Sequence, residues 1–238
     1  MNKLKMMLCA VFTLMLVNIG TTAQADSSNF AGPYIGVSAS GYGMQLSGSS
    51  TTSPTDGVFE FDEVSVGQVA PVTGFEAGYA IPLGSAFLID IGAAMYTGEA
   101  KLEFHRDGTK KAADARYADE DSAGDKDVQM KISNLNAAWI APTLVLSDTS
   151  SLYLKVGVSE AEVVVSGDIK PTGDLQGTTW ALGTRTVLES GIFVRTEAGY
   201  TDYNGISTHG KGTNISTQNS YSAEPTVAYG SVSLGFRF

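Results

Sequence analysis

The chain has 238 residues, of which 43% are hydrophobic, and 25 acidic residues stand against 15 basic ones. Because duplex binding needs a basic surface that neutralises phosphates, this balance argues against nucleic acid as a partner. The single cysteine is Cys9, within a segment that we expect to be removed, so the mature chain should have neither disulfides nor a cysteine nucleophile or ligand.

Residues 1–25 have the three parts of a secretory signal peptide. Lys3 and Lys5 give a positive start, Met6–Ile19 an apolar stretch of 14 residues, and Ala23–Ala25 an A-x-A cleavage site. A retained signal anchor is the alternative, but the stretch is shorter than the roughly 20 residues that span a bilayer as a helix. We therefore expect cleavage after Ala25. The loss of two lysines leaves 213 residues with a net charge of −12.

The mature chain, residues 26–238, is expected to form one domain. It has no apolar run approaching a membrane helix, and segments of about ten residues alternate between bulky apolar and small or polar side chains, which is the pattern of β-strands. Eight segments follow in chain order: Tyr34–Gly41, Phe75–Ile81, Phe87–Ala93, Ile132–Leu146, Leu152–Ser159, Trp180–Leu188, Ile192–Tyr200 and Ala228–Phe238.

The connections between these segments alternate in length. Short turns at one end and long loops at the other are typical of outer-membrane barrels, in which the long loops lie outside the cell. A soluble domain seldom has four connections this long. The turns are near 82–85, 147–150 and 189–191, and the loops near 43–70, 99–130, 163–177 and 202–224.

Seven ionisable residues favour a membrane barrel over a soluble, lipocalin-like one. They lie on the strand face opposite the bulky apolar residues, whereas a soluble barrel carries its charges outside. We predict an all-β, eight-stranded antiparallel up-and-down transmembrane β-barrel with a lumen filled by ion pairs. The network is Glu76, Asp90, Lys155, Arg185, Arg195, Glu197 and Arg237, and the three arginines are expected to neutralise the three acids.

The last strand and the aromatic residues add to this interpretation. Bulky side chains alternate to the final residue, in a pattern that resembles the terminal signal read by the barrel assembly machinery: Val232, Leu234, Phe236 and Phe238. Aromatic residues near strand ends are expected to form the girdles at the two membrane interfaces. These are Tyr79, Phe87, Trp139, Trp180, Tyr200 and Phe236.

Five segments together carry a family resemblance: Gly32–Tyr42, Phe75–Tyr79, Leu152–Gly157, Thr196–Tyr203 and Leu234–Phe238. In this order and spacing they resemble the outer membrane protein A transmembrane-domain family, which includes the opacity-protein-like and outer membrane protein X-like small barrels. The resemblance implies an eight-stranded barrel with a charged interior in the outer membrane of a Gram-negative bacterium. It also implies a role within the range of envelope integrity, adhesion and immune resistance.

Enzymatic chemistry on lipid would need a nucleophile and a base held together. The mature chain has only two histidines, His105 and His209, both in expected loops and neither in a His-x-Ser pattern. We therefore expect no catalytic residues, no enzymatic activity and no cofactor.

The region between Glu99 and Gln129 has nine acidic and six basic residues. Asp119, Asp121 and Gly124 resemble part of an EF-hand, but Met130 stands where the motif needs a bidentate glutamate. No metal site is therefore assigned. We favour a solvated loop of mixed charge, and divalent ions would then bridge this loop to lipopolysaccharide.

Two main functions stay open. One is a structural or surface-interaction protein whose long loops contact a host or envelope ligand. The other is a narrow, low-conductance porin for small solutes, and a lipid-modifying barrel enzyme is less favoured. The expected partners are outer-membrane lipid and lipopolysaccharide, the barrel assembly machinery, and the loop ligand.

Overall fold

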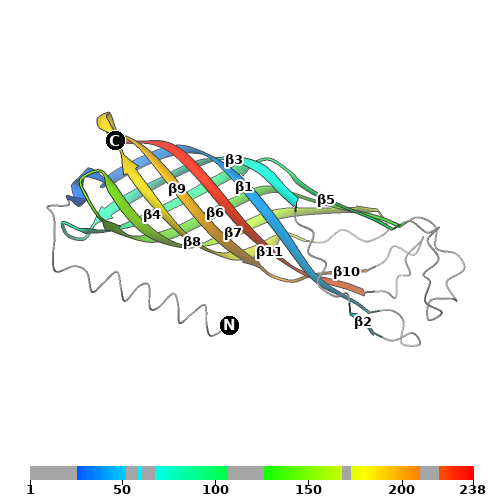
Figure 1. The fold of residues 1–238 in the computed structure, drawn as a ribbon. Coiled ribbons are helices and arrows are strands. Elements are labelled where there is room, and N and C mark those ends of the chain that lie inside the picture. The colour runs from blue at the N-terminus through cyan, green and yellow to red at the C-terminus, as the bar shows by residue number, and fades with distance from the viewer. Residues whose placement is uncertain (1–25, 52–57, 61–67, 107–125, 168–172, 210–219) are drawn as a thin grey trace, which may run out of the picture.

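The computed structural model describes residues 26–51, 58–60, 68–106, 126–167, 173–209 and 220–238. Within these residues, eight long strands wrap into one closed antiparallel sheet, which confirms the predicted barrel (Figure 1). The strands are β1 (Gly32–Thr51), β3 (Gln68–Pro82), β4 (Phe87–Thr97), β6 (Lys126–Val145), β7 (Ser150–Gly167), β8 (Leu175–Val187), β9 (Ile192–Tyr203) and β11 (Ser220–Arg237).

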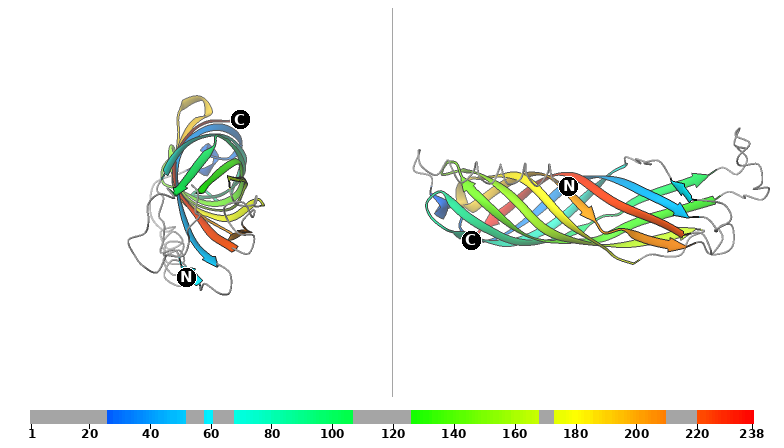
Figure 2. Two further views of the ribbon diagram at one scale, coloured as in Figure 1. Left: turned by 90° about the vertical axis from the view of Figure 1, so that its right-hand side faces the viewer. Right: turned by 90° about the horizontal axis from the view of Figure 1, so that it is seen from below.

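The barrel closes where the first long strand meets the last. β1 pairs with β11 from Tyr34 opposite Arg237 to Thr51 opposite Ser220. The other long strands each pair with their neighbours in chain order, so the topology is up-and-down, and the closed ring is visible in Figure 2. Closure satisfies the backbone N–H and C=O groups, which in lipid would find no other partner.

The two ends of the barrel differ. At the turn end, short connections join β3 to β4, β6 to β7 and β8 to β9, the last through the 3-10 turn η4 (Glu189–Gly191). At the loop end, three short strands extend the sheet: β2 (Val58–Glu60), β5 (Ala100–Arg106) and β10 (Ile206–His209).

The predicted loops are too long, because strands continue into all four of them. β1 runs to Thr51, β7 runs to Gly167, and β6 already begins at Lys126, where it pairs with β5. Apolar residues still alternate with polar ones in these extensions, as in β6, where Val128, Met130 and Ile132 stand at every second position. The extensions were missed because the many charged residues of this region favoured a solvated loop.

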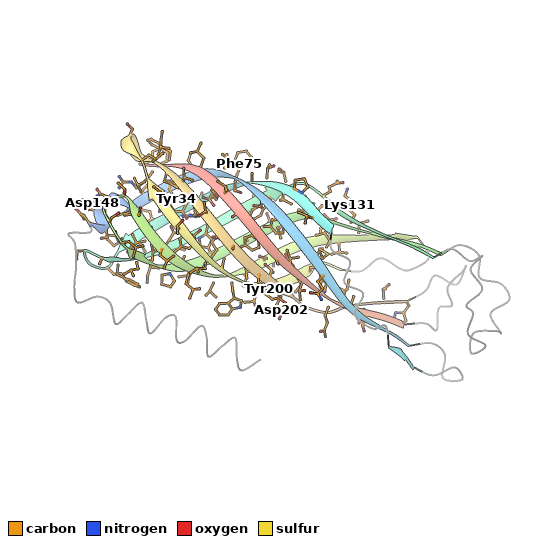
Figure 3. All side chains as sticks on the ribbon, viewed as in Figure 1. Tyr34, Phe75, Lys131, Asp148, Tyr200 and Asp202 are labelled. Atoms are coloured by element: carbon orange, nitrogen blue, oxygen red, sulfur yellow. The ribbon has the colours of Figure 1, made fainter. Side chains whose placement is uncertain are left out.

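Side chains alternate between the two faces as predicted. On β1, Ile35 and Val37 point outward and are 53% and 49% exposed. Ser38 points into the barrel and is 8% exposed. Phe75 of β3 likewise points away from the barrel, as Figure 3 shows. The outer face is therefore apolar over the middle of the barrel.

Three layers of side chains fill the inside. An apolar turn-end cluster comes first: Phe30, Tyr34, Ala80, Leu88, Val145, Val187 and Phe193. A charged layer lies next to it and includes Glu76, Asp90, Lys155, Arg185, Arg195 and Glu197, all buried. Beyond that layer lies an apolar loop-end cluster: Met44, Ala161, Val163, Leu175, Tyr203 and Val227.

The segment that precedes β1 lies at the turn end of the barrel, where it forms the 3-10 turn η2 (Ser27–Asn29) (Figure 1). Its Ser27 amide donates to the Ser85 carbonyl at 2.8 Å, and its Phe30 is fully buried in the turn-end cluster. Among the described residues, no helix is long and apolar enough to span a membrane. Residues 1–25 lie outside the described residues, so cleavage after Ala25 stays a prediction.

Candidate functional site

The charged layer is the candidate site, because it gathers six of the seven predicted network residues. They come from strands all around the barrel, Glu76 from β3, Asp90 from β4, Lys155 from β7, Arg185 from β8, and Arg195 and Glu197 from β9. Every one is at most 7% exposed. Three carboxylates thus balance three cations inside the barrel.

Asp90 is the centre of the layer. Its Oδ1 accepts hydrogen bonds from the Tyr34 hydroxyl at 2.7 Å and from Trp139 Nε1 at 3.2 Å. Its Oδ2 accepts from Arg195 Nη2 at 3.2 Å and from Arg185 Nη1 at 3.5 Å. Four donors from four strands converge on one carboxylate, so Asp90 ties opposite walls of the barrel together.

Glu197 is the centre of a second group. Its Oε2 lies 2.6 Å from Lys155 Nζ and accepts a hydrogen bond from the Tyr153 hydroxyl at 2.7 Å. Its Oε1 accepts from the Tyr229 hydroxyl, also at 2.7 Å. The Lys155 ammonium lies 4.1 Å from the centre of the Trp139 ring, which gives the cation a second partner.

The arginines connect the acids to aromatic rings. Arg195 Nη1 lies 3.4 Å from Glu76 Oε1, so this one guanidinium joins Glu76 to Asp90. Arg185 Cζ lies 4.1 Å from the centre of the Phe193 ring. Guanidinium groups on aromatic faces keep favourable contacts where little water reaches them.

Arg237 is placed apart from this layer, contrary to the expectation that it neutralises an acid. Its Nη1 donates to the carbonyls of Ser28 at 2.8 Å and Ala31 at 3.1 Å. Lys155 instead provides the cation beside Glu197. Face alternation placed Arg237 inside correctly, but it gave no height along the barrel, and Arg237 belongs to the turn end.

Sequence reasoning missed the neutral hydrogen-bond donors of the layer. Tyr153 and Tyr229 do alternate with outward apolar residues, so the strand pattern had placed them on the polar face. Trp139 was expected in a membrane girdle, and that prediction is wrong because the ring is buried inside at 4% exposure. On β6 both faces carry apolar residues near Trp139, so alternation alone did not separate inside from outside.

Three other girdle residues do point outward: Tyr79, Tyr200 and Phe236 are each at least 41% exposed. The terminal alternation also lies on the outer face, where Val232, Leu234 and Phe238 are exposed. Its reading by the assembly machinery stays a prediction.

Two small cavities flank the layer. The lower one, toward the turn end, has about 10 Å³ and is lined by Phe30, Asp90, Thr143, Arg185 and Arg195 among others. The upper one has about 10 Å³ and is lined by Tyr42, Tyr96, Lys155 and Tyr229 among others. A volume of this size holds about one water molecule. The charged layer is therefore packed nearly solid.

Among the described residues, no group of three or more His, Cys, Asp or Glu side chains is placed to hold a metal ion. His105 lies in β5 opposite Asp127, and His209 lies in β10 opposite Ser220. Residues 119–124 of the rejected EF-hand interpretation lie outside the described residues.

Comparison with known proteins gives a family and a set of similar folds. No curated protein matches the chain. Among solved structures, OprG from Pseudomonas aeruginosa has 13% sequence identity, covers 87% of this chain and 97% of its own, and has a TM-score of 0.48. Neisserial surface protein A has 11% identity over 87% of this chain and 98% of its own, with a TM-score of 0.47. Ail from Yersinia pestis has 10% identity over 87% and 99%, with a TM-score of 0.42.

The family assignment rests on a family model. The model of the outer membrane protein beta-barrel domain matches residues 11–224, which is most of the chain. With the closed eight-stranded sheet, the apolar outer face and the charged interior already described, the chain belongs to the outer membrane protein beta-barrel domain family.

Proposed function

We propose that this protein is a closed scaffold in the outer membrane whose loop end carries a structural or surface-interaction role, in envelope integrity, adhesion or immune resistance. The observation that carries the proposal is the filled lumen. Six buried charges cancel one another, and the cavities beside them are water-sized. A barrel that transports nothing through its centre leaves its exposed loops as the parts available to ligands.

The length of the strands supports a role at the loop end. β1 and β6 have 20 residues each, about twice the 9–11 that a tilted strand needs to cross a bilayer. The extra length has its own apolar filling, the loop-end cluster. The extension is thus a packed platform at the loop end, beyond the part of the barrel that crosses the membrane.

The outer surface changes character along β6, β7 and β8. Next to the loop end, Asn134 Nδ2 donates to Glu162 Oε2 at 2.6 Å, and Gln176 Nε2 donates to Glu160 Oε1 at 3.2 Å. Farther down, the same face is apolar, with Ile140, Val158 and Leu182 exposed. This change supports lipid as the partner of the middle of the barrel and lipopolysaccharide head groups as the partner above it.

A narrow, low-conductance porin is the second candidate, and one observation favours it. Arg185 Nε and Nη2 and Arg195 Nε are buried without a hydrogen-bond partner in the protein, and both residues line the lower cavity. Guanidinium groups with spare donors can exchange partners, and such exchange would open a path for small ions. Conductance of the intact barrel separates this function from the closed scaffold.

The proposal is non-enzymatic. His105 and His209 lie in two different extensions of the sheet, β5 and β10, which join different neighbours. A base and a nucleophile on one catalytic site would have to lie within hydrogen-bond reach.

The test replaces residues 107–125 by a short Gly-Ser linker. The intact and altered chains are displayed on the same Gram-negative host, and folded protein is counted by the mobility shift between heated and unheated gel samples. We expect equal amounts of folded barrel, with weaker adhesion to host cells or poorer survival in serum for the altered chain. A control chain with residues 168–172 replaced shows whether one loop or the whole end matters.

The surface role would be contradicted if adhesion and survival were the same for the intact chain, both altered chains and the empty host. If the intact barrel also conducts ions in vesicles, the low-conductance porin replaces the surface role as the proposed function.

A further inference from the structure

We propose that residues 26–31 form a plug over the turn end of the lumen, and that removal of the signal peptide completes the plug by creating a charge at the Asp26 nitrogen. The first part rests on packing and hydrogen bonds of the described residues. The second rests also on the expected cleavage after Ala25. The proposal goes beyond the surface role, because it concerns how the other end of the barrel is sealed.

The Phe30 ring is the part of the plug that closes the turn end of the lumen. It is fully buried against Tyr34, Leu88 and Phe193 of the turn-end cluster. The same ring lines the lower cavity, together with Asp90 and Thr143. Phe30 therefore lies between the charged layer and the outside at this end.

Backbone and side-chain hydrogen bonds hold the plug to the first turn. The Ser27 amide donates to the Ser85 carbonyl at 2.8 Å, and Ser27 Oγ donates to the Gly84 carbonyl at 2.5 Å. The plug's own turn is capped because Asp26 Oδ1 accepts from the Ser28 amide at 2.9 Å. This backbone hydrogen bond lowers the pKa of the Asp26 carboxyl.

The last strand holds the other side of the plug. Arg237 Nη1 donates to both the Ser28 and the Ala31 carbonyls. This contact explains why Arg237 is absent from the charged layer. It also means that the plug is complete only after β11 has closed on β1, since Arg237 stands opposite Tyr34 in that pairing.

The second turn supplies the acceptor for the new charge. The Asp26 nitrogen lies 3.2 Å from Asp148 Oδ1, in the turn between β6 and β7, which Figure 3 shows at the turn end. Before cleavage this nitrogen is a neutral amide. Hydrolysis of the Ala25–Asp26 bond adds hydroxide to the Ala25 carbonyl carbon and a proton to the nitrogen, which takes up another proton to become an ammonium. Because the acceptor is a carboxylate before and after cleavage, the new charge adds the attraction of an exposed ion pair to a hydrogen bond that already exists.

The first experiment measures access to the lower cavity. The mature chain has no cysteine of its own, because Cys9 precedes the cleavage site. Thr143→Cys therefore places a single thiol on the cavity wall, at a site that is 4% exposed. The barrel starting at Asp26 is refolded in detergent, and the rate of reaction with a small cationic methanethiosulfonate reagent is recorded.

Phe30→Ala is then added to the reporter chain. Because the substitution removes the ring that covers the lower cavity, we expect the Thr143→Cys thiol to react at least about tenfold faster. The matched control is Phe75→Ala, which truncates the same residue type on the outer face and should leave the rate unchanged. Fast labelling of the parent, or equal rates for Phe30→Ala and the parent, would overturn the plug.

The second experiment tests the charge and changes no core residue. Acetylation of the Asp26 amine should speed labelling roughly 1.5- to fivefold, which is the range for an exposed ion pair. In an Asp148→Asn chain the same acetylation should have no effect, because the partner is gone. An equal effect of acetylation in both chains would refute the ion pair even if the plug itself stands.

These outcomes are separable from the proposed function. A parent barrel that conducts ions would end the closed scaffold, whereas the difference between Phe30→Ala and Phe75→Ala reports on the plug alone. If the Phe30→Ala chain does not fold, as judged by heated and unheated gel samples, Ser27→Ala removes the contact with Gly84 instead and must accelerate labelling for the plug to survive.

Discussion

The charged layer and the loop-end cluster fill one barrel with opposite chemistry. Around the charged layer the outer face is apolar and inner groups pair by charge, as with Asp90 and Arg195. Around the loop-end cluster the outer face carries polar groups such as Glu160 and Glu162, and inner residues such as Leu175 are apolar. In lipid, burial of an apolar side chain inside the barrel gains little over exposure, so hydrogen bonds and ion pairs must specify the interior. In water, burial of apolar surface provides the driving force.

The largest expected effect comes from the centre of the charged layer. Asp90→Asn keeps the shape of the side chain but leaves Arg185 and Arg195 short of a negative partner. Breaking a buried ion pair from one side costs about 3–5 kcal/mol. Urea unfolding of the barrel in lipid vesicles measures this loss, and Asp202→Asn, on the exposed outer face, serves as the control. If the two substitutions cost the same, the layer is not a coupled network.

Lys155→Met should cost somewhat less, about 3 kcal/mol, because Glu197 keeps the Tyr153 and Tyr229 hydroxyls. Adding Glu197→Gln should recover most of this loss, since the unpaired charge is then removed as well. A double-mutant cycle in the same unfolding assay checks the coupling. Additive losses would show that Lys155 and Glu197 act independently.

Two consecutive residues of β7 provide a matched pair in the loop-end cluster. Val163 is 4% exposed and Val164 is 44% exposed. Because two carbons leave a packed interior, Val163→Ala should cost about 2 kcal/mol, and Val164→Ala much less. We also expect the loss from Val163→Ala to be insensitive to salt. Equal losses for the two valines would mean that the extension has no packed core.

The smallest expected loss of stability comes from Trp139, which differs from Trp180 in lying inside the barrel. Trp139→Phe removes the indole donor to Asp90 and should cost about 1.5 kcal/mol, the lower end for a hydrogen bond to a charged group. Single-tryptophan chains give a more direct readout. Brominated lipid should quench Trp180, on the outer face, and leave Trp139 bright, whereas strong quenching of Trp139 would restore its assignment to the girdle.

The parts of the fold that depend on period two were predictable from the sequence. Alternation located eight strands and placed Glu76, Asp90 and Glu197 inside, because bulky residues such as Phe75 and Ile91 faced the other way. Alternation alone gives the face of a residue and not its height along the barrel, and so the pairing of Arg237 was missed. Its place next to the end of the last strand puts Arg237 at the turn end, whereas Glu76 and Glu197 lie in mid-strand. Strand ends outside the apolar band also alternate, as with Leu102 and Phe104 of β5, but the charged residues around them favoured a solvated loop.

The plug could not be predicted from the sequence, for a different reason. Residues 26–31 have no periodic pattern, and their structure comes from contacts with three distant elements: the turn at Ser85, the turn at Asp148 and the end of β11 at Arg237. Such contacts follow from closure of the barrel and not from local sequence. Tyr34 shows the same dependence, since its hydroxyl passes over Gly78 of β3 to reach Asp90 on β4.

The central claim is that the lumen is closed by its own side chains. Ion conductance of the mature barrel, reconstituted in planar bilayers as protein that shows a mobility shift on heating, tests it most directly. We predict conductance at the background level for the parent chain and channel openings after Asp90→Asn, which loosens the charged layer. Steady conductance of the parent chain would contradict the closed scaffold and establish a narrow porin.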